Sequence, residues 1–264
     1  MKKRAIAAAI AASTMAVATS VGAAWTFSAT NGSNLSATAI FDIVGGNLQV
    51  VLSNVGGDVL VPADVLTALF FDIPNVAALT PISAVLTSGS TAVFDAQGQP
   101  AGGVVGGEWD YISGVNAPGS ATEGIGSAGF GLFADGGFPG ADLDPPAAVN
   151  GMNYGLLSAS DNLATGNAQV TGNNPFVRNS VTFTLSGIPA NFDLTTIGEV
   201  SFQYGTALTE PNIPGSGGAS TGGASTGGAS TGGQIPEPSS TSLALLGVAL
   251  LGAGMWKRRL STQG

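Results

Sequence analysis

"LSATAIFDIVGGNLQVVLSNV", residues 35–55, reads as two β-strands joined by a tight turn. From Leu35 to Ile43, apolar residues occupy every second position, which is the period at which side chains alternate between the two faces of a strand. Two glycines followed by Asn47 suit a two-residue turn, because glycine adopts positive φ without steric cost. This stretch therefore predicts an antiparallel hairpin with one buried face.

Alternating patterns continue along the chain, and no stretch shows a clear 3.6-residue period. Residues 63–73 are mostly apolar and predict a strand buried on both faces, whereas "SVTFTL" (180–185) alternates as a half-buried strand does. Further strands are expected within 83–95, 108–113, 129–133, 153–159, 176–188 and 198–206. About ten short strands predict an all-β ectodomain, a β-sandwich or jelly roll, over residues 25–213. The Gly-, Pro- and Asp-rich stretch 100–146 is expected to form long loops.

Charge is distributed unevenly along the chain. Between residues 25 and 237, sixteen acidic residues accompany one cation, Arg178, and give a net charge of −15. Such a body would repel phosphate backbones, so we expect no nucleic-acid partner. Its carboxylates could attract Ca²⁺ where several oxygens converge.

Cysteine and histidine are both absent from the sequence. Without cysteine there can be no disulfide, thiolate nucleophile or iron–sulfur cluster. Without histidine, the usual general base of a hydrolytic triad is missing. The composition therefore favours a non-enzymatic protein.

The first 24 residues have the three parts of a secretory signal peptide. Lys2, Lys3 and Arg4 precede an Ala-rich apolar stretch, and small residues follow. Cleavage after Ala24 would place Ala24 and Gly22 at the positions where signal peptidase requires small residues, and cleavage after Ala23 is the alternative. We expect residues 1–24 to be removed on export.

The C-terminal part begins with a low-complexity linker at residues 214–235. Residues 217–233, "GGASTGGASTGGASTGG", are three copies of a five-residue unit followed by Gly-Gly, a composition typical of a flexible tether. Residues 236–264 follow with Pro236, Glu237 and Pro238, an apolar segment that ends at Trp256, and the basic residues Lys257, Arg258 and Arg259. The apolar segment predicts a transmembrane helix, with the basic residues held on the cytoplasmic side.

This order of tripeptide, apolar segment and basic cluster, behind an N-terminal export signal, resembles the PEP-CTERM sorting signal of exosortase-dependent proteins in Gram-negative bacteria. The resemblance covers about 30 residues of the chain. It implies that the protein is held transiently at the inner membrane, and that a membrane-bound exosortase processes it near the Pro-Glu-Pro motif. The product would then go to the cell surface or to the extracellular polysaccharide matrix.

"EWDY" (108–111) is a candidate ligand-binding stretch. In a strand, Glu108 and Asp110 would share one side and Trp109 the other, so that a sugar ring could stack on Trp109 beside carboxylates. The same two carboxylates could form the acid and base of a glycosidase. The structural alternative is a buried tryptophan with a solvated acidic edge.

Asp135, Asp142 and Asp144 lie in a Gly/Pro-rich stretch and are candidate Ca²⁺ ligands, with turn-capping aspartates as the alternative. No other cofactor is expected. We therefore expect an exported, exosortase-processed surface or matrix protein with a structural or adhesive role. A carbohydrate-binding module and a secreted glycoside hydrolase remain alternatives.

Overall fold

The computed structural model describes residues 23–134, 137–145, 149, 151–172 and 174–219. These residues form fourteen β-strands, joined by turns and by short 3-10 segments. The 3-10 segments are η1 (Pro62–Asp64), η2 (Ala101–Gly103), η3 (Gly106–Glu108), η4 (Pro118–Ser120) and η5 (Leu194–Thr196). The described part of the chain is therefore all-β, as predicted.

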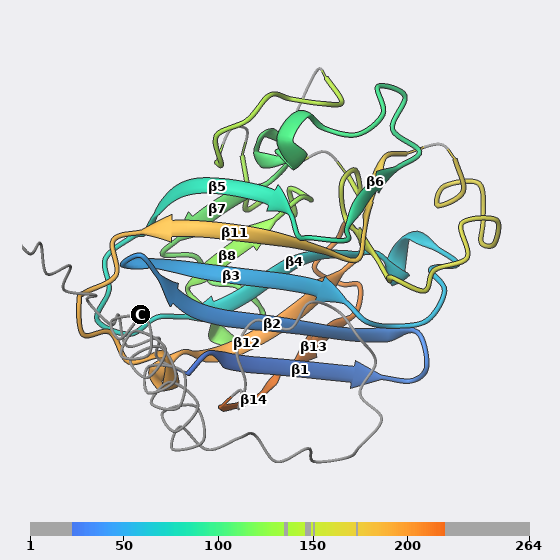
Figure 1. Cartoon of the computed structure of the whole chain (residues 1–264). Coiled ribbons are helices and arrows are strands. Elements are labelled where there is room, and N and C mark those ends of the chain that lie inside the picture. The colour runs from blue at the N-terminus through green and yellow to red at the C-terminus, as the bar shows by residue number, and fades with distance from the viewer. Residues whose placement is uncertain (1–22, 135–136, 146–148, 150, 173, 220–264) are drawn as a thin grey trace, which may run out of the picture. The chain divides into compact units, whose positions relative to one another are not determined.

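The strands belong to two sheets. The first sheet is antiparallel throughout and has the order β14-β1-β2-β3-β11-β5. Its strands are β1 (Trp25–Asn31), β2 (Leu35–Val44), β3 (Asn47–Asn54), β5 (Thr80–Leu86), β11 (Ser180–Ser186) and β14 (Ser216–Ala219). In Figure 1 most of this sheet forms the front layer.

The second sheet has the order β13-β12-β4-β9-β10-β6, and β8 pairs with both β4 and β7. Its strands are β4 (Leu66–Asp72), β6 (Thr91–Val93), β7 (Asp110–Ser113), β8 (Glu123–Gly126), β9 (Leu156–Leu157), β10 (Phe176–Arg178), β12 (Gly198–Tyr204) and β13 (Asn212–Pro214). Figure 1 shows β4, β8 and β12 crossing behind the first sheet. Most strands of this sheet are shorter than those of the first, with β4 and β12 as the long members.

The hairpin predicted from residues 35–55 is present as β2 and β3. Gly45 and Gly46 take φ values of 59° and 80°, the left-handed conformation that a two-residue turn needs at both positions. On β2 the side chains of Ala37, Ala39 and Phe41 are fully buried and alternate with partly exposed neighbours. The prediction of a one-sided hairpin is confirmed.

The main hydrophobic core lies between the two sheets, which is the layering of a β-sandwich. The Phe41 ring of β2 meets the Phe71 ring of β4 at a centroid distance of 5.4 Å. On the other face of β4, the Phe70 ring stacks on Phe133 at 6.1 Å and forms a second cluster. The strand predicted to be buried on both faces is thus β4.

Some local predictions differ from the structure. Residues 129–133 form a turn instead of a strand, because Phe130 and Phe133 fold back onto Phe70. Within the stretch 100–146, β7 lies inside the strand predicted at 108–113, whereas β8 lies where loops were expected. The last strand, β14, ends at Ala219, which is six residues beyond the predicted end of the ectodomain at residue 213.

The two ends of the described body lie side by side. In the pairing of β1 with β14, Trp25 is opposite Ala219 and Ser28 is opposite Ser216. The segments before Trp25 and after Ala219 are therefore attached at the same corner of the first sheet. Within the described residues, no helix has the length and apolarity needed to cross a membrane. The terminal helices expected within 1–24 and 243–256 fall almost entirely outside those residues.

Candidate functional site

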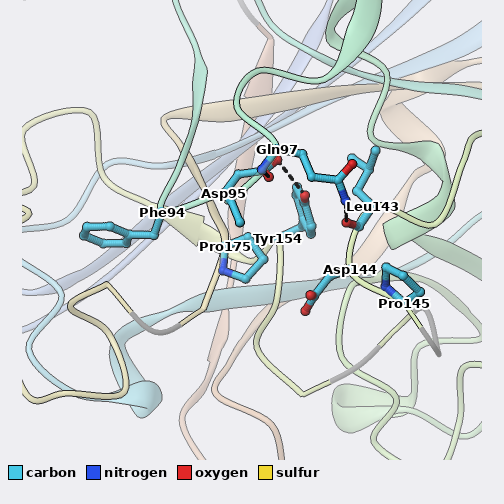
Figure 2. A pocket seen from close by; sticks show the side chains of 9 residues that line it. Phe94, Asp95, Gln97, Leu143, Asp144, Pro145, Tyr154 and Pro175 are labelled. Carbon is cyan, nitrogen blue, oxygen red and sulfur yellow. Dashed lines mark hydrogen bonds between the residues drawn. The ribbon is translucent and has the colours of Figure 1, made fainter.

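A small hollow of about 170 Å³ opens between two loops, beside Tyr154 and Pro175 (Figure 2). Its volume is below the range usual for drug-sized ligands, so it could accept one small ring or polar group. It is lined by Phe94, Asp95, Ala96, Gln97, Leu143, Asp144, Pro145, Tyr154 and Pro175.

Hydrogen bonds hold the polar groups of the hollow in place. The Tyr154 hydroxyl donates to Asp95 Oδ2 at 2.9 Å, and the Gln97 backbone N–H donates to Asp95 Oδ1 at 2.7 Å. The Gln97 side chain also donates to the Leu143 carbonyl at 3.1 Å, which joins the two loops. Asp144 accepts a hydrogen bond from the Asn153 amide. Burial, together with the bond to Asp95, raises the pKa of the Tyr154 hydroxyl, so it stays protonated.

Two aromatic residues at the hollow have left-handed backbone conformations. Phe94 has a φ of 57° and Tyr154 a φ of 55°. Bulky residues rarely take positive φ, and such strain occurs preferentially at binding sites. The hollow thus combines fixed carboxylates, proline rings and local strain, and none of its lining residues is a cation.

The predicted sugar-stacking residue lies elsewhere, in the main core. Trp109 has 0% exposure, and its ring meets the Phe183 ring edge-on at a centroid distance of 5.0 Å. No face of the indole is left for a sugar. The proposed stacking role of Trp109 does not fit this structure, whereas the alternative of a buried tryptophan does.

The two carboxylates beside Trp109 are buried too, so the expected solvated acidic edge is absent. Glu108 is 1% exposed and Asp110 is 6% exposed. Glu108 Oε1 accepts the backbone N–H groups of Leu143 and Asp144, and Asp110 Oδ2 accepts the Ala134 N–H at 2.9 Å. Each carboxylate therefore anchors the loop that covers it.

Glycines allow this loop to lie directly on the chain around Glu108. A Cβ on Gly106 or Gly107 would fall 2.0 Å from the carbonyl oxygen of Pro139 or Ala141, respectively. A Cβ on Gly137 would fall 1.9 Å from Asp110 Oδ1. This close approach needs glycine at all three positions, and it is what buries the carboxylates.

Burial, with a smaller contribution from the nearby Asp142 and Asp144, raises the pKa of Glu108 to about 7 against the lowering effect of its backbone hydrogen bonds. A carboxyl with such a pKa could act as a general acid near neutral pH. Its position under the loop, however, leaves no room for a substrate. Glu108 and Asp110 thus serve as loop anchors in this structure and do not form an accessible acid–base pair.

The candidate Ca²⁺ ligands are only partly described. Asp135 lies outside the described residues. Asp142 Oδ1 accepts the Asp144 N–H at 3.2 Å, as a turn-capping aspartate does. Among the described residues, no group of three or more acidic, histidine or cysteine side chains could hold a metal ion.

Sequence reasoning missed the hollow, because Asp95, Gln97, Asp144 and Tyr154 come from three separate segments of the chain. It also missed a further buried carboxyl, Glu123. Tyr111 donates its hydroxyl to Glu123 and accepts the Leu79 N–H at 3.0 Å. Desolvation raises the pKa of Glu123, against the lowering effect of the hydrogen bond from Tyr111.

The sorting residues Pro236, Glu237, Pro238, Trp256, Lys257, Arg258 and Arg259 lie outside the described residues. Comparison with protein families finds the PEP-CTERM protein-sorting motif at residues 234–259. No curated protein and no solved structure matches the chain. The motif confirms the resemblance drawn from the sequence, and it indicates a secreted protein that exosortase processes after anchoring in the membrane.

Proposed function

We propose that this chain, which carries the PEP-CTERM protein-sorting motif, is a structural or adhesive component of the cell surface or the extracellular polysaccharide matrix. Exosortase would release it from the inner membrane after signal peptidase has removed residues 1–24. The observation that carries this proposal is the motif at residues 234–259, which follows a separately folded β-body and a Gly/Ser/Thr repeat.

The geometry of the body supports this order of events. Trp25 and Ala219 are paired, so the export signal and the tether to the sorting motif are attached at one corner. Both ends of the body can therefore face the membrane at the same time. The body's acidity would keep it soluble and away from anionic surfaces once released.

The proposal is tested by intact-mass spectrometry of the protein from its native host, with and without exosortase. We expect the segment after about Pro238 to be missing only when the enzyme is present. Retention of the full tail in both hosts would show a permanently anchored envelope protein. A variant with Pro236 and Pro238 changed to Ala controls for the motif and should keep its tail in either host.

A second candidate function is carbohydrate binding, which the hollow at Tyr154 favours. Fixed carboxylates can accept hydrogen bonds from sugar hydroxyls, and the flanking proline rings offer apolar contact. Binding to purified exopolysaccharide should fall at least about tenfold in Asp95→Asn, which removes one charged acceptor. Asp142→Asn, at an exposed carboxylate outside the lining of the hollow, is the matched control and should bind normally. Equal binding by both variants would exclude the hollow.

We propose no catalytic role. Hydrolysis of the polysaccharide by the purified body, abolished by Glu108→Gln, would contradict this and restore the glycoside hydrolase alternative. Because Glu108 is buried under its loop, such activity would also require that loop to open.

A further inference from the structure

The last strand of the body is made from the beginning of the repeat. β14 (Ser216–Ala219) has the sequence Ser-Gly-Gly-Ala, and it pairs with β1 so that Gly217 is opposite Phe27 and Gly218 is opposite Thr26. The unit Ser/Thr-Gly-Gly-Ala then occurs again at residues 221–224 and 226–229. The sequence therefore offers three nearly identical occupants for one strand position.

The edge of β1 selects this unit through the first glycine. A Cβ on Gly217 would lie 2.4 Å from Cε1 of Phe27, a side chain that is buried and packed against Phe41. The next glycine is different, since a Cβ on Gly218 would meet nothing within 4 Å. A shift of five residues places Gly222 opposite Phe27, and a shift of ten places Gly227 there. Each shift restores the other residues of the unit to their positions, except that Thr replaces Ser216.

We propose that the edge of β1 is a binding site for the Ser/Thr-Gly-Gly-Ala unit, and that any of the three copies in the same chain occupies it. The repeat is then an adjustable tether that moves in steps of five residues. With the first copy bound, residues 220–235 separate the body from Pro236; with the third copy bound, only 230–235 do. The expected end-to-end distance of this segment falls from about 22 Å to about 13 Å.

The same chain is the occupant that the geometry favours. β13 is bound to β12, and the Gly215 N–H donates to the Val200 carbonyl at 2.8 Å, so the repeat starts next to the edge of β1. A segment tethered this closely has a millimolar effective concentration, which a second copy in dilute solution does not reach. Longer connections to the second and third copies reduce this advantage only slowly with length.

The absence of cysteine from the chain allows a direct test with introduced cysteine pairs. Thr26→Cys is combined in the full-length protein with Gly218→Cys, Gly223→Cys or Gly228→Cys, the three equivalent positions. Disulfide formation is measured in glutathione buffers, which gives an effective concentration for each pair. Pairs of Thr26→Cys with Ser225→Cys or Ser230→Cys are the controls, since they have similar chain lengths but the wrong phase of the repeat.

We expect the Gly223→Cys and Gly228→Cys pairs to exceed their phase-shifted controls by at least about tenfold, because chain length alone predicts nearly equal values. Adding Gly222→Ala to the Gly223→Cys pair should remove this excess, since the new Cβ would strike Phe27. Equal effective concentrations in both phases would overturn the proposal. Disulfide-linked dimers in place of cross-linked monomers would also overturn it, by assigning the site to a second copy.

Discussion

The first sheet and the loop-covered edge of the second sheet are built on different principles. In the first sheet, strands such as β2 and β11 alternate buried apolar residues with partly exposed ones, and side-chain packing fixes their register. At β7 and the segment before it, glycines let two stretches of backbone touch, and buried carboxylates bind the N–H groups of the covering loop. Apolar packing tolerates wide changes of pH, whereas anchoring through carboxyl groups does not.

The largest effect should come from the apolar core. Phe41→Ala removes a fully buried ring that contacts Phe27 and Phe71, and it should lower the free energy of unfolding by about 3–5 kcal/mol. Chemical denaturation of the body measures this loss. Phe41→Leu, which keeps most of the volume, should recover more than half of it. A loss below about 1 kcal/mol for Phe41→Ala would show that the two sheets do not share this core.

The pH dependence should come from the other region. Glu108 has a pKa of about 7 in the folded body, against an ordinary value near 4.5, so the folded state binds more protons between these values. The free energy of unfolding should therefore fall as the pH rises from about 4.5 to 7, by about 2 kcal/mol from this group. Buried Glu123 and Asp161, whose pKa values desolvation also raises, should add slopes of the same sign.

Glu108→Gln should flatten this dependence, because the amide oxygen still accepts the two N–H bonds but carries no charge. Glu199→Gln, at an exposed position, should keep the wild-type slope. Stability that instead increases from pH 5 to 7 in the wild type would show that Glu108 is ionised at little cost.

A local effect should follow from a methyl group placed between the two backbones. In Gly107→Ala the new Cβ would lie 2.0 Å from the Ala141 carbonyl, so the covering loop must move away. Hydrogen exchange at Leu143 and Asp144 should then become at least about tenfold faster, because these N–H groups lose Glu108 as acceptor. Gly198→Ala is the matched control, since a Cβ there meets nothing within 4 Å. Unchanged exchange in Gly107→Ala would contradict the close approach.

The smallest effect should appear on the outer, partly buried side of the first sheet. The hydroxyls of Thr87 and Thr182 are 2.9 Å apart across neighbouring segments. Thr182→Ala should lower the free energy of unfolding by about 0.5 kcal/mol, as is usual for one cross-strand pair. Thr182→Val keeps the β-branched shape and removes only the hydroxyl. It therefore separates the effect of the lost hydrogen bond on stability from the effect of strand propensity. A loss above about 2 kcal/mol would place this pair in the core.

Sequence patterns predicted the first sheet well for a physical reason. On β2 and β11, each residue's environment follows from its place in a two-residue period, so Phe41 and Phe183 could be assigned to the core directly. The turn at Gly45 and Gly46 could likewise be predicted from adjacent residues alone. Predictions failed where the environment comes from distant residues. Trp109 is covered by Phe183, and Glu108 by Leu143, neither of which any local pattern links to it.

The hollow at Tyr154 could not be predicted for the same reason, since its carboxylates belong to different loops. The sorting motif was the opposite case. Its information lies in a contiguous order of residues that an enzyme reads, and the family comparison found it without reference to any fold.

The pairing of β14 with β1 also has a mechanical consequence. When the tail is held and the body is pulled away, tension along the tether reaches β14 before any other strand. A four-residue edge strand can peel from Ala219 inward, one pair of residues at a time, while the buried core between the sheets stays intact. Peeling these four residues would release about 14 Å of chain without disturbing the core, and the same pairing could re-form afterwards.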